Sequence, residues 1–342
     1  MGSLKLYNCI YEFLLRYLPK IRGVSHNTID NYRDTLALFL PFCAQYFSVN
    51  VKSLRVEHLS PNVVLTFLDY LEVQRKNVAK TRNTRLGAIK SLSKMIRLVH
   101  PEKMEIAEKI LRIPKKKEQK TLIGFLYPDE ILSVLASVDL KRKEGFRDYT
   151  ILHLLFDSGA RASEMAELKL DYFDPAHKIM AVLGKGNRFR LVTLCPKTTQ
   201  LLRLYIIKYR SLPKPIYSQR IFINQRGEGL SRHGINRLCR KYLSLALPDD
   251  RVKVLNPVHS FRHSRAVNML ASGCGVEEIA NRLGHQNTSS LLAYFHLDLP
   301  NVQAIQRQLN EDFESMVLED QKIEEFMDWR NKRKVLSWLD SL

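Results

Sequence analysis

The stretch LGHQNTSSLLAYFH, residues 283–296, holds two side chains that could take part in a reaction. His285 comes first, and Tyr294 follows nine residues later among apolar neighbours such as Leu292 and Phe295. A tyrosine on an apolar helix is usually a packing residue, because a phenol with a pKa of about 10 is a weak nucleophile near neutral pH. Reactivity at Tyr294 therefore requires cations near its target, supplied from elsewhere in the chain.

Three cationic side chains precede this stretch, each in a setting that favours contact with a ligand. Arg161 in GARASEMAEL follows a glycine break, and Glu164, one turn later, can orient it. Lys185 in GKGNR lies at the tip of a predicted hairpin, where flanking glycines allow close approach to a ligand. Arg262 in HSFRH offers a planar fork of donors that suits a phosphate. Each signal alone is weak, but together with the histidines and the tyrosine they give Arg, Lys, His-x-x-Arg, His and Tyr in that order, which is a strong signal.

The motif HSFRH also permits a different interpretation, as a metal site. His259 and His263 stand four residues apart and can share one helix face, as zinc ligands do in HExxH. However, Ser260 occupies the position of the glutamate, and no cysteine or carboxylate cluster nearby completes a coordination sphere. We therefore predict no metal site at this motif.

The elements that must position these residues are mixed in type. Two helical stretches are interrupted at Gly159. The segment KIMAVLGKGNRFRLVTL has an alternating pattern of side chains and a turn at Gly184 and Gly186, which together are typical of a β-hairpin. A helix around residues 201–209 and a short strand RIFIN at 220–224 should follow. The segment thus predicts a helical fold that includes a small sheet.

The sequence GCGVEEIANRLG resembles the centre of a helix-turn-helix, with a second helix that stops at Gly284. Glu277 and Glu278 occupy the amino end of that helix, where contacts with bases and phosphates would be made. We therefore favour a packing role for this helix over recognition of DNA bases. The helix would then position His285 at its carboxyl end.

The overall charge indicates a polyanionic partner. The chain has 342 residues and a formal net charge of +19. Residues 1–120 hold 22 Lys and Arg against 10 Asp and Glu, whereas residues 311–342 hold 5 against 9. Taking these net charges of +12 and −4 from the total of +19 leaves +11 on the remaining residues, 121–310. These two basic segments are expected to meet the polyanion, and the acidic tail to meet protein or water.

Cysteine usage and the absence of long apolar runs suggest a cytoplasmic protein. The five cysteines are widely spaced and form no CxxC pair, which argues against a disulfide framework and a zinc ribbon. No run of eighteen apolar residues and no cleavable leader is recognisable, so no membrane contact is expected.

The first segment reads as helical and basic. Ser25 and Ser60 are suited to cap helices, and Pro61 suits a first helical position. A third helix over residues 79–99 buries one apolar face and carries no acid on its other surface, so contact with a phosphate backbone is favoured over a merely solvated face. A basic linker follows. The predicted DNA contacts are Lys80, Arg82, Arg85, Lys90, Lys94, Lys115, Lys116 and Lys117.

The pieces GARASEMAEL, GKGNRFRLVTL, HSFRH and LGHQNTSSLLAYFH resemble the tyrosine recombinase family, which includes phage integrases. The resemblance is specific over residues 159–296 and looser over 1–310. It implies a mostly α fold with a small β-sheet, in which a helical core-binding domain and a mixed catalytic domain form a clamp around DNA. The corresponding boundaries are 1–112 for the core-binding domain, 113–126 for the linker, 127–310 for the catalytic domain and 311–342 for a tail.

The same resemblance implies a role for each site residue. Tyr294 attacks the scissile phosphate to give a 3′-phosphotyrosyl link, Lys185 protonates the leaving 5′-oxygen, and His259 assists removal of the phenol proton. The remaining roles are charge stabilisation by Arg161, Arg262 and His285, with Glu164 and His263 in support. No metal ion or high-energy cofactor is implied.

Three other functions remain to be weighed against a site-specific recombinase. A type IB topoisomerase shares the chemistry without a partner protomer, a noncatalytic DNA-binding regulator would use the same basic surface, and a metal-dependent nuclease lacks ligands here.

The expected partners are double-stranded DNA, further copies of the chain in a tetramer, and accessory DNA-bending proteins. Apolar residues in 323–339 suggest that the tail packs on its own domain or on a neighbouring protomer. The setting would be a mobile element and a nucleoid-associated enzyme.

Overall fold

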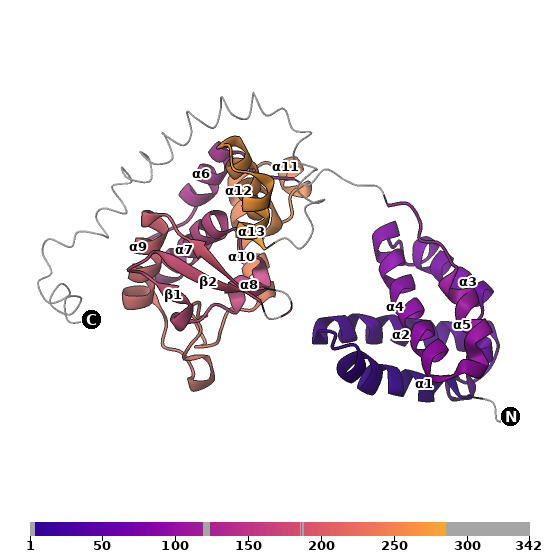
Figure 1. The fold of residues 1–342 in the computed structure, drawn as a ribbon. Helices are drawn as coiled ribbons and strands as arrows, with labels where there is room; N and C mark the ends of the chain where they lie inside the picture. The colour runs from indigo at the N-terminus through magenta and orange to yellow at the C-terminus, as the bar shows by residue number, and fades with distance from the viewer. Residues whose placement is uncertain (1–3, 119–123, 185, 187, 285–342) are drawn as a thin grey trace, which may run out of the picture. The chain divides into compact units, whose positions relative to one another are not determined.

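The computed structural model describes residues 4–118, 124–184, 186 and 188–284. The chain divides into two compact units after residue 121, a point within the predicted linker, and each unit is described by itself (Figure 1). Among the described residues, no helix has the length and apolar character that crossing a membrane requires.

The first unit is helical throughout its described part (Figure 1). It contains α1 (Leu6–Glu12), which continues as a π-helical segment (Phe13–Ile21), then α2 (His26–Tyr46), α3 (Pro61–Val73), α4 (Ala79–Val99) and α5 (Met104–Leu111), with short 3-10 turns at Val51–Ser53, Val56–His58 and Pro101–Lys103. Helix α3 begins as predicted, because Ser60 Oγ accepts a hydrogen bond from the Val63 amide at 3.4 Å and Pro61 opens the first turn.

The core of the first unit forms from the apolar faces that the helical spacing predicts. Phe39 of α2 and Phe67 of α3 are fully buried, with their rings edge to face at 5.2 Å. Leu86 and Leu92 of α4 are also fully buried. The predicted inward face of α4 is therefore confirmed.

The second unit combines helices with one small sheet (Figure 1). Its elements are α6 (Pro128–Ala136), α7 (Lys143–Ser158), α8 (Ala162–Ala166), β1 (Phe173–Asp174), β2 (Ile179–Leu183), β3 (Phe189–Thr193), α9 (Pro196–Leu204), a π-helical turn (Tyr205–Tyr209), α10 (Arg232–Ala246), α11 (Asp249–Lys253), α12 (His259–Ala271) and α13 (Val276–Leu283). The elements predicted for this segment are present, except for one strand.

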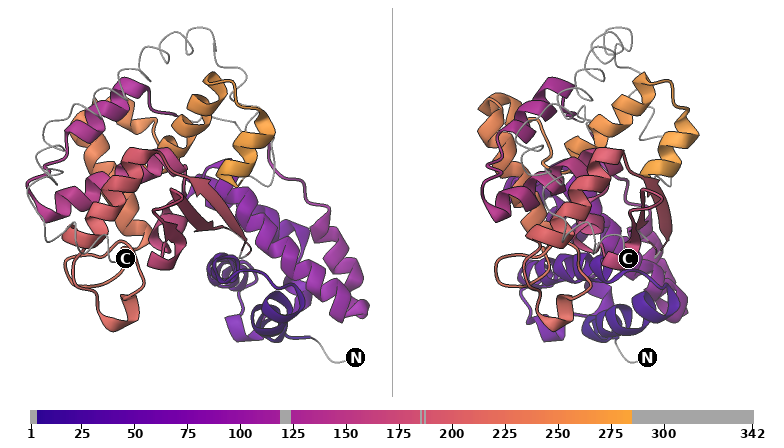
Figure 2. Two further views of the ribbon diagram at one scale, coloured as in Figure 1. Left: turned by 60° about the vertical axis from the view of Figure 1, so that its left-hand side comes forward. Right: turned by 90° about the vertical axis from the view of Figure 1, so that its left-hand side faces the viewer.

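The sheet is antiparallel, in the order β1-β2-β3, and the predicted hairpin forms its larger part. Val182 pairs with Arg190 across β2 and β3. Val182 and Val192 face the core and are fully buried, whereas Leu191, which points the other way, is 69% exposed. Helix α12 packs on both α7 and α13, and α13 also packs on β3 (Figure 2). These contacts bring the turn after α7, the start of α12, the end of α13 and strand β3 close together.

The strand predicted for RIFIN was wrong. In place of a strand, Arg220 forms an isolated bridge with Lys169, and Ile223 forms another with Gly229. Ile221, Phe222 and Ile223 are still buried, so the apolar run reports burial and not sheet pairing.

Candidate active site

Arg161 lies directly after a sharp turn that ends α7. Gly159, with φ of +60°, ends the helix in the left-handed conformation, which only glycine adopts easily. Arg161 then caps the short helix α8. This turn explains how the arginine projects away from the buried body of α7, with its side chain 32% exposed.

Glu164 holds Arg161 from the first turn of α8. Its Oε1 accepts a 2.6 Å hydrogen bond from Arg161 Nη1, and its Oε2 accepts a 2.9 Å bond from the Arg161 amide. Burial alone would raise the pKa of this carboxyl, but a hydrogen bond from Arg190, together with the charges of Arg190 and Arg161, lowers it to about 2. Glu164 is therefore a buried, ionised anchor.

Arg262 comes from the first turns of α12 and is almost completely buried, at 2% exposure. Its Nη1 donates a 2.7 Å hydrogen bond to the Gly159 carbonyl, and its Nη2 donates to the Leu283 carbonyl. The guanidinium thus joins the turn before Arg161 to the end of α13.

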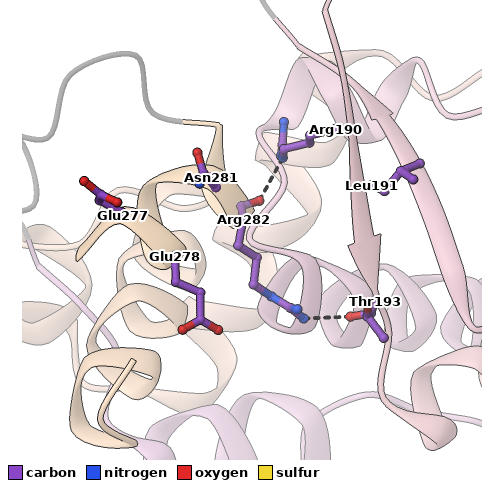
Figure 3. Close-up of a pocket in the computed structure, with 7 residues that line it drawn as sticks. All are labelled: Arg190, Leu191, Thr193, Glu277, Glu278, Asn281 and Arg282. Atoms are coloured by element: carbon purple, nitrogen blue, oxygen red, sulfur yellow. Dashed lines mark hydrogen bonds between the residues drawn. The ribbon is translucent and has the colours of Figure 1, made fainter. Parts of the chain in front are cut away.

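Three arginines meet the carbonyl end of α13. Arg190 Nε donates to the Arg282 carbonyl at 3.0 Å (Figure 3), Arg262 donates to that of Leu283, and Arg161 Nη2 donates to that of Gly284 at 3.3 Å. The last carbonyls of a helix lack intrahelical partners and carry partial negative charge, so cations are favoured there. Three successive carbonyls immediately before position 285 are therefore fixed by guanidinium groups.

Asp157, 5% exposed, forms a second carboxylate anchor behind this helix end. Its Oδ2 accepts a 2.7 Å hydrogen bond from the Cys195 amide, and its Oδ1 lies 3.7 Å from Arg265 Nη2 and 3.6 Å from Arg282 Nη2. Arg282 Nη2 also donates to the Thr193 carbonyl at 2.7 Å (Figure 3). Asp157 thus links α7, α12, α13 and the segment after β3.

An open pocket of about 720 Å³ lies between β3 and α13 (Figure 3). Acidic side chains of α13 and basic side chains of both elements line it together: Arg190, Leu191, Thr193, Glu277, Glu278, Asn281 and Arg282. Glu277 and Glu278 therefore stand at this pocket, on the first turn of a helix that is packed through Ile279, Ala280 and Leu283. This agrees with the predicted packing role of α13.

Comparison with known proteins identifies the family. The model of the phage integrase family matches residues 124–299, and that of the phage integrase N-terminal SAM-like domain matches residues 11–97. A putative integrase/recombinase, y4rC, of Sinorhizobium fredii is 31% identical over 84% of this chain and 86% of its own length. The chain belongs to the phage integrase family.

Further relatives place this family member among tyrosine recombinases. The tyrosine recombinase XerD of Staphylococcus epidermidis is 28% identical over 89% of this chain and 99% of its own length. The XerH site-specific recombinase bound to a palindromic difH substrate shares the fold with a TM-score of 0.64 and 20% identity, covering 87% of this chain and 86% of that one. This protein is a site-specific tyrosine recombinase, and the predicted fold class and enzyme class are confirmed. The topoisomerase and regulator alternatives are not favoured.

The structure of the recombinase brings part of the predicted site together. Arg161 and Arg262 converge on the end of α13, and Glu164 holds Arg161 there. Lys185, His285 and Tyr294 lie outside the described residues. The hairpin around Lys185 is closed by a 2.8 Å hydrogen bond from the Gly184 amide to the Arg188 carbonyl.

The two histidines of HSFRH lie on one face of α12. His259 is exposed at the helix start, and His263 is half-buried, with ring centroids 6.2 Å apart. Within the described ranges, no group of three or more His, Cys, Asp or Glu is placed to hold a metal ion.

Sequence reasoning missed Arg190, as it missed Asp157. Arg190 and Val192 are two residues apart on β3, so both point to the inward face of the strand, where a charged residue is unusual. That inward charge in an otherwise alternating strand was the available signal, because such a group must find a buried partner.

The predicted DNA contacts of the recombinase differ in exposure. Lys80, Lys94, Lys115, Lys116 and Lys117 are exposed. Arg82 is only 7% exposed, and both it and Lys116 pair with Glu72 of α3, at 3.3 and 2.8 Å. The other two contact neighbouring elements, since Arg85 donates to Thr35 Oγ1 and Lys90 donates to the Leu111 carbonyl.

Proposed function

We propose that this recombinase cuts and rejoins duplex DNA by two transesterifications through a phosphotyrosine at Tyr294. The observation that carries the proposal is the meeting of Arg161 and Arg262, from separate motifs, at the carbonyl end of α13. His285 is the next residue of the chain and Tyr294 follows nine positions later. Such an arrangement supplies positive charge beside the place where the chain continues into its nucleophile.

In the first step the Tyr294 oxygen attacks phosphorus as the bond to the 5′-oxygen breaks. The phenol proton passes to His259, and the departing 5′-oxygen takes a proton from Lys185. The phosphodiester becomes a 3′-phosphotyrosyl ester, so its bond energy is conserved. A 5′-hydroxyl from the partner strand then reverses the step and releases the tyrosine.

Negative charge on the nonbridging oxygens grows during both steps. Preorganised donors aimed at that charge lower the barrier, each by roughly 3 kcal/mol in comparable sites. We assign this role to Arg161, Arg262 and His285. Among the described residues, the Arg161 side chain donates to Glu164 and Gly284 only, whereas a guanidinium has five N–H bonds in all. Glu164 and His263 are assigned as supports.

Binding of the duplex is proposed to involve both units, with domains as in the sequence analysis: 1–112, 113–126, 127–310 and 311–342. The exposed lysines Lys80, Lys94, Lys115 and Lys117 would contact the phosphate backbone. Burial and the charges of Lys115 and Lys94 lower the pKa of Lys90, which indicates mutual repulsion in this basic surface. A polyanion relieves that repulsion. Arg82, paired and buried, is left out of this set.

Solved relatives bound to DNA support the proposal for assembly and setting. The solved XerH is bound to difH DNA, and the Tn1549 transposon integrase, with a TM-score of 0.61 and 18% identity over 87% of this chain and 98% of that one, is in complex with circular intermediate DNA. We propose a tetramer on paired DNA sites, in which the segment 311–342 contacts a neighbouring protomer. We further propose that the recombinase belongs to a mobile element and is cytoplasmic and nucleoid-associated. Accessory DNA-bending proteins would assist it.

Covalent capture tests the proposal. The capture pool consists of nicked duplexes that tile the DNA on both sides of the gene, together with random-sequence duplexes. The wild-type protein should form a denaturation-resistant adduct with a subset of this pool in excess chelator, and Tyr294→Phe should form none. An adduct with Tyr294→Phe, or none with wild type, would overturn the proposal.

A further inference from the structure

We infer that Arg190 is a positioning residue for the reaction, which sets the orientation of Arg161 through the shared carboxylate of Glu164. This inference rests on the proposed function. Arg190 lies on β3, five residues after Lys185, and its side chain is 11% exposed. It therefore acts from within the protein on groups that face the DNA.

The first contact of Arg190 is with Glu164. Arg190 Nη2 donates to Glu164 Oε2 at 2.7 Å, while Arg161 Nη1 donates to Oε1 at 2.6 Å. One buried carboxylate thus holds two guanidinium groups, one on each oxygen. Without Arg190, the whole charge of Glu164 would be balanced by Arg161 alone. The carboxylate would then be free to turn toward Arg161 and draw its guanidinium away from the phosphate.

The second contact of Arg190 is with α13. Its Nε donates to the Arg282 carbonyl at 3.0 Å (Figure 3). Arg282 lies two residues before Gly284, whose carbonyl accepts a hydrogen bond from Arg161. Nε and Nη2 occupy one edge of the guanidinium, so a single planar group fixes Glu164 and α13 relative to each other. Arg161 is tied to the same two elements. Arg190 and Arg161 therefore close a frame around the end of α13.

The hairpin that carries Lys185 is rooted in this frame. A Cβ built on Gly184 would lie 3.7 Å from both Arg190 Nη1 and Glu164 Oε1. The backbone that enters the lysine turn therefore runs against the Arg190–Glu164 pair, and Arg190 itself lies on the strand that leaves the turn.

The chain offers a matched control for Arg190. Arg188 lies on the same hairpin and carries the same charge, but its side chain is exposed. Arg188→Gln and Arg190→Gln therefore remove equal charge, and only the second removes the link to Glu164. Arg190→Lys keeps the positive charge but cannot make both hydrogen bonds, to Glu164 and to the Arg282 carbonyl, from one planar group. This variant therefore separates the loss of geometry from the loss of charge.

The test is single-turnover adduct formation with the duplex that wild type selects from the capture pool, at saturating DNA. A misplaced cation costs about ten- to a hundredfold in rate, so Arg190→Gln should slow adduct formation by that factor while DNA affinity is unchanged. Arg190→Lys should give an intermediate rate, and Arg188→Gln a rate within about twofold of wild type. Combining Arg190→Gln with Glu164→Gln should slow the reaction no further than Glu164→Gln alone, because both act on Arg161.

A substrate with a neutral methylphosphonate at the scissile position provides a readout that a general folding defect would not change. With no second nonbridging charge to hold, the orientation of Arg161 matters less, so the gap between Arg190→Gln and wild type should shrink on this substrate. Equal rates for Arg190→Gln and wild type on the ordinary duplex, or an undiminished gap on the methylphosphonate, would overturn the inference. Absence of any wild-type adduct would instead overturn the proposed function and remove the basis of the inference.

Discussion

Arg262 Nη1 donates a 2.7 Å hydrogen bond to the carbonyl of Gly159, two residues before Arg161. The two arginines come from motifs about a hundred residues apart in the chain. Their connection through one glycine shows that the turn after α7 is shared by both cations. A change in that turn should therefore affect both arginines together.

Substituting Gly159→Ala tests the importance of the turn. The φ of +60° disfavours alanine, and the new Cβ would come within 2.3 Å of Leu283 Cδ2, on a fully buried side chain. We expect a loss of about 2 kcal/mol or more in the free energy of unfolding, measured by urea denaturation. Gly275→Ala is the control, because its φ is −70° and nothing lies within 4 Å of its Cβ. Equal effects of the two substitutions would contradict this account of the turn.

The Glu164 carboxylate should make stability depend on acid pH. Its pKa falls from 4.5 to about 2 on folding, so its contribution is fully present above pH 4.5 and is lost as the pH falls toward 2. Denaturation of wild type and Glu164→Gln between these pH values measures the effect. The variant should be less stable than wild type at pH 6 and should show a shallower decline on acidification. A parallel decline in both proteins would exclude Glu164 as its source.

Asp157→Asn should destabilise the second unit. The amide keeps an acceptor for the Cys195 N–H, but Arg265 and Arg282 lose their shared negative partner and repel each other. Because both arginines are about one-fifth exposed and lie 3.6 to 3.7 Å from Asp157, we expect a cost of roughly 1–2 kcal/mol in unfolding free energy. Asp250→Asn, whose side chain is 96% exposed, is the matched control and should cost almost nothing. A destabilisation by Asp250→Asn as large as that by Asp157→Asn would argue against a buried anchor.

Neutralising the exposed lysines of the first unit should weaken DNA binding and make the affinity depend less steeply on salt concentration. Replacing Lys80, Lys94, Lys115 or Lys117 with glutamine should each reduce the slope of log affinity against log salt by about 1. Lys109→Gln is the control, because this side chain pairs with Glu105 on α5. Binding to random-sequence duplex, measured by fluorescence anisotropy at several salt concentrations, gives the slopes. Unchanged slopes for all four lysine variants would remove them from the DNA-contact set.

Local sequence signals predicted the elements well where one face is buried. Ser60 and Pro61 define the start of α3, and the glycines of GKGNR mark the turn between β2 and β3. The strand at RIFIN was wrong because a short apolar run shows burial, whereas the existence of a strand depends on a partner from elsewhere in the chain.

Ion pairs between side chains on different helices or strands could not be predicted from the local sequence. The absence of acids within residues 80–99 excluded pairs along α4, but Glu72 of the preceding helix pairs with Arg82 and Lys116. Arg190 and Asp157 were missed for the same reason, since their partners lie on other elements. In contrast, Arg161 and Glu164 were found because both members of the pair belong to one helical turn.

The most direct test of the account is to locate the covalent bond. The wild-type protein is incubated with the capture pool in excess chelator, digested with a protease and a nuclease, and analysed by mass spectrometry. We expect a nucleotide attached through its 3′-phosphate to the Tyr294 oxygen, and no such peptide from Tyr294→Phe. A nucleotide on any other residue, or a 5′-phosphate linkage at Tyr294, would contradict it.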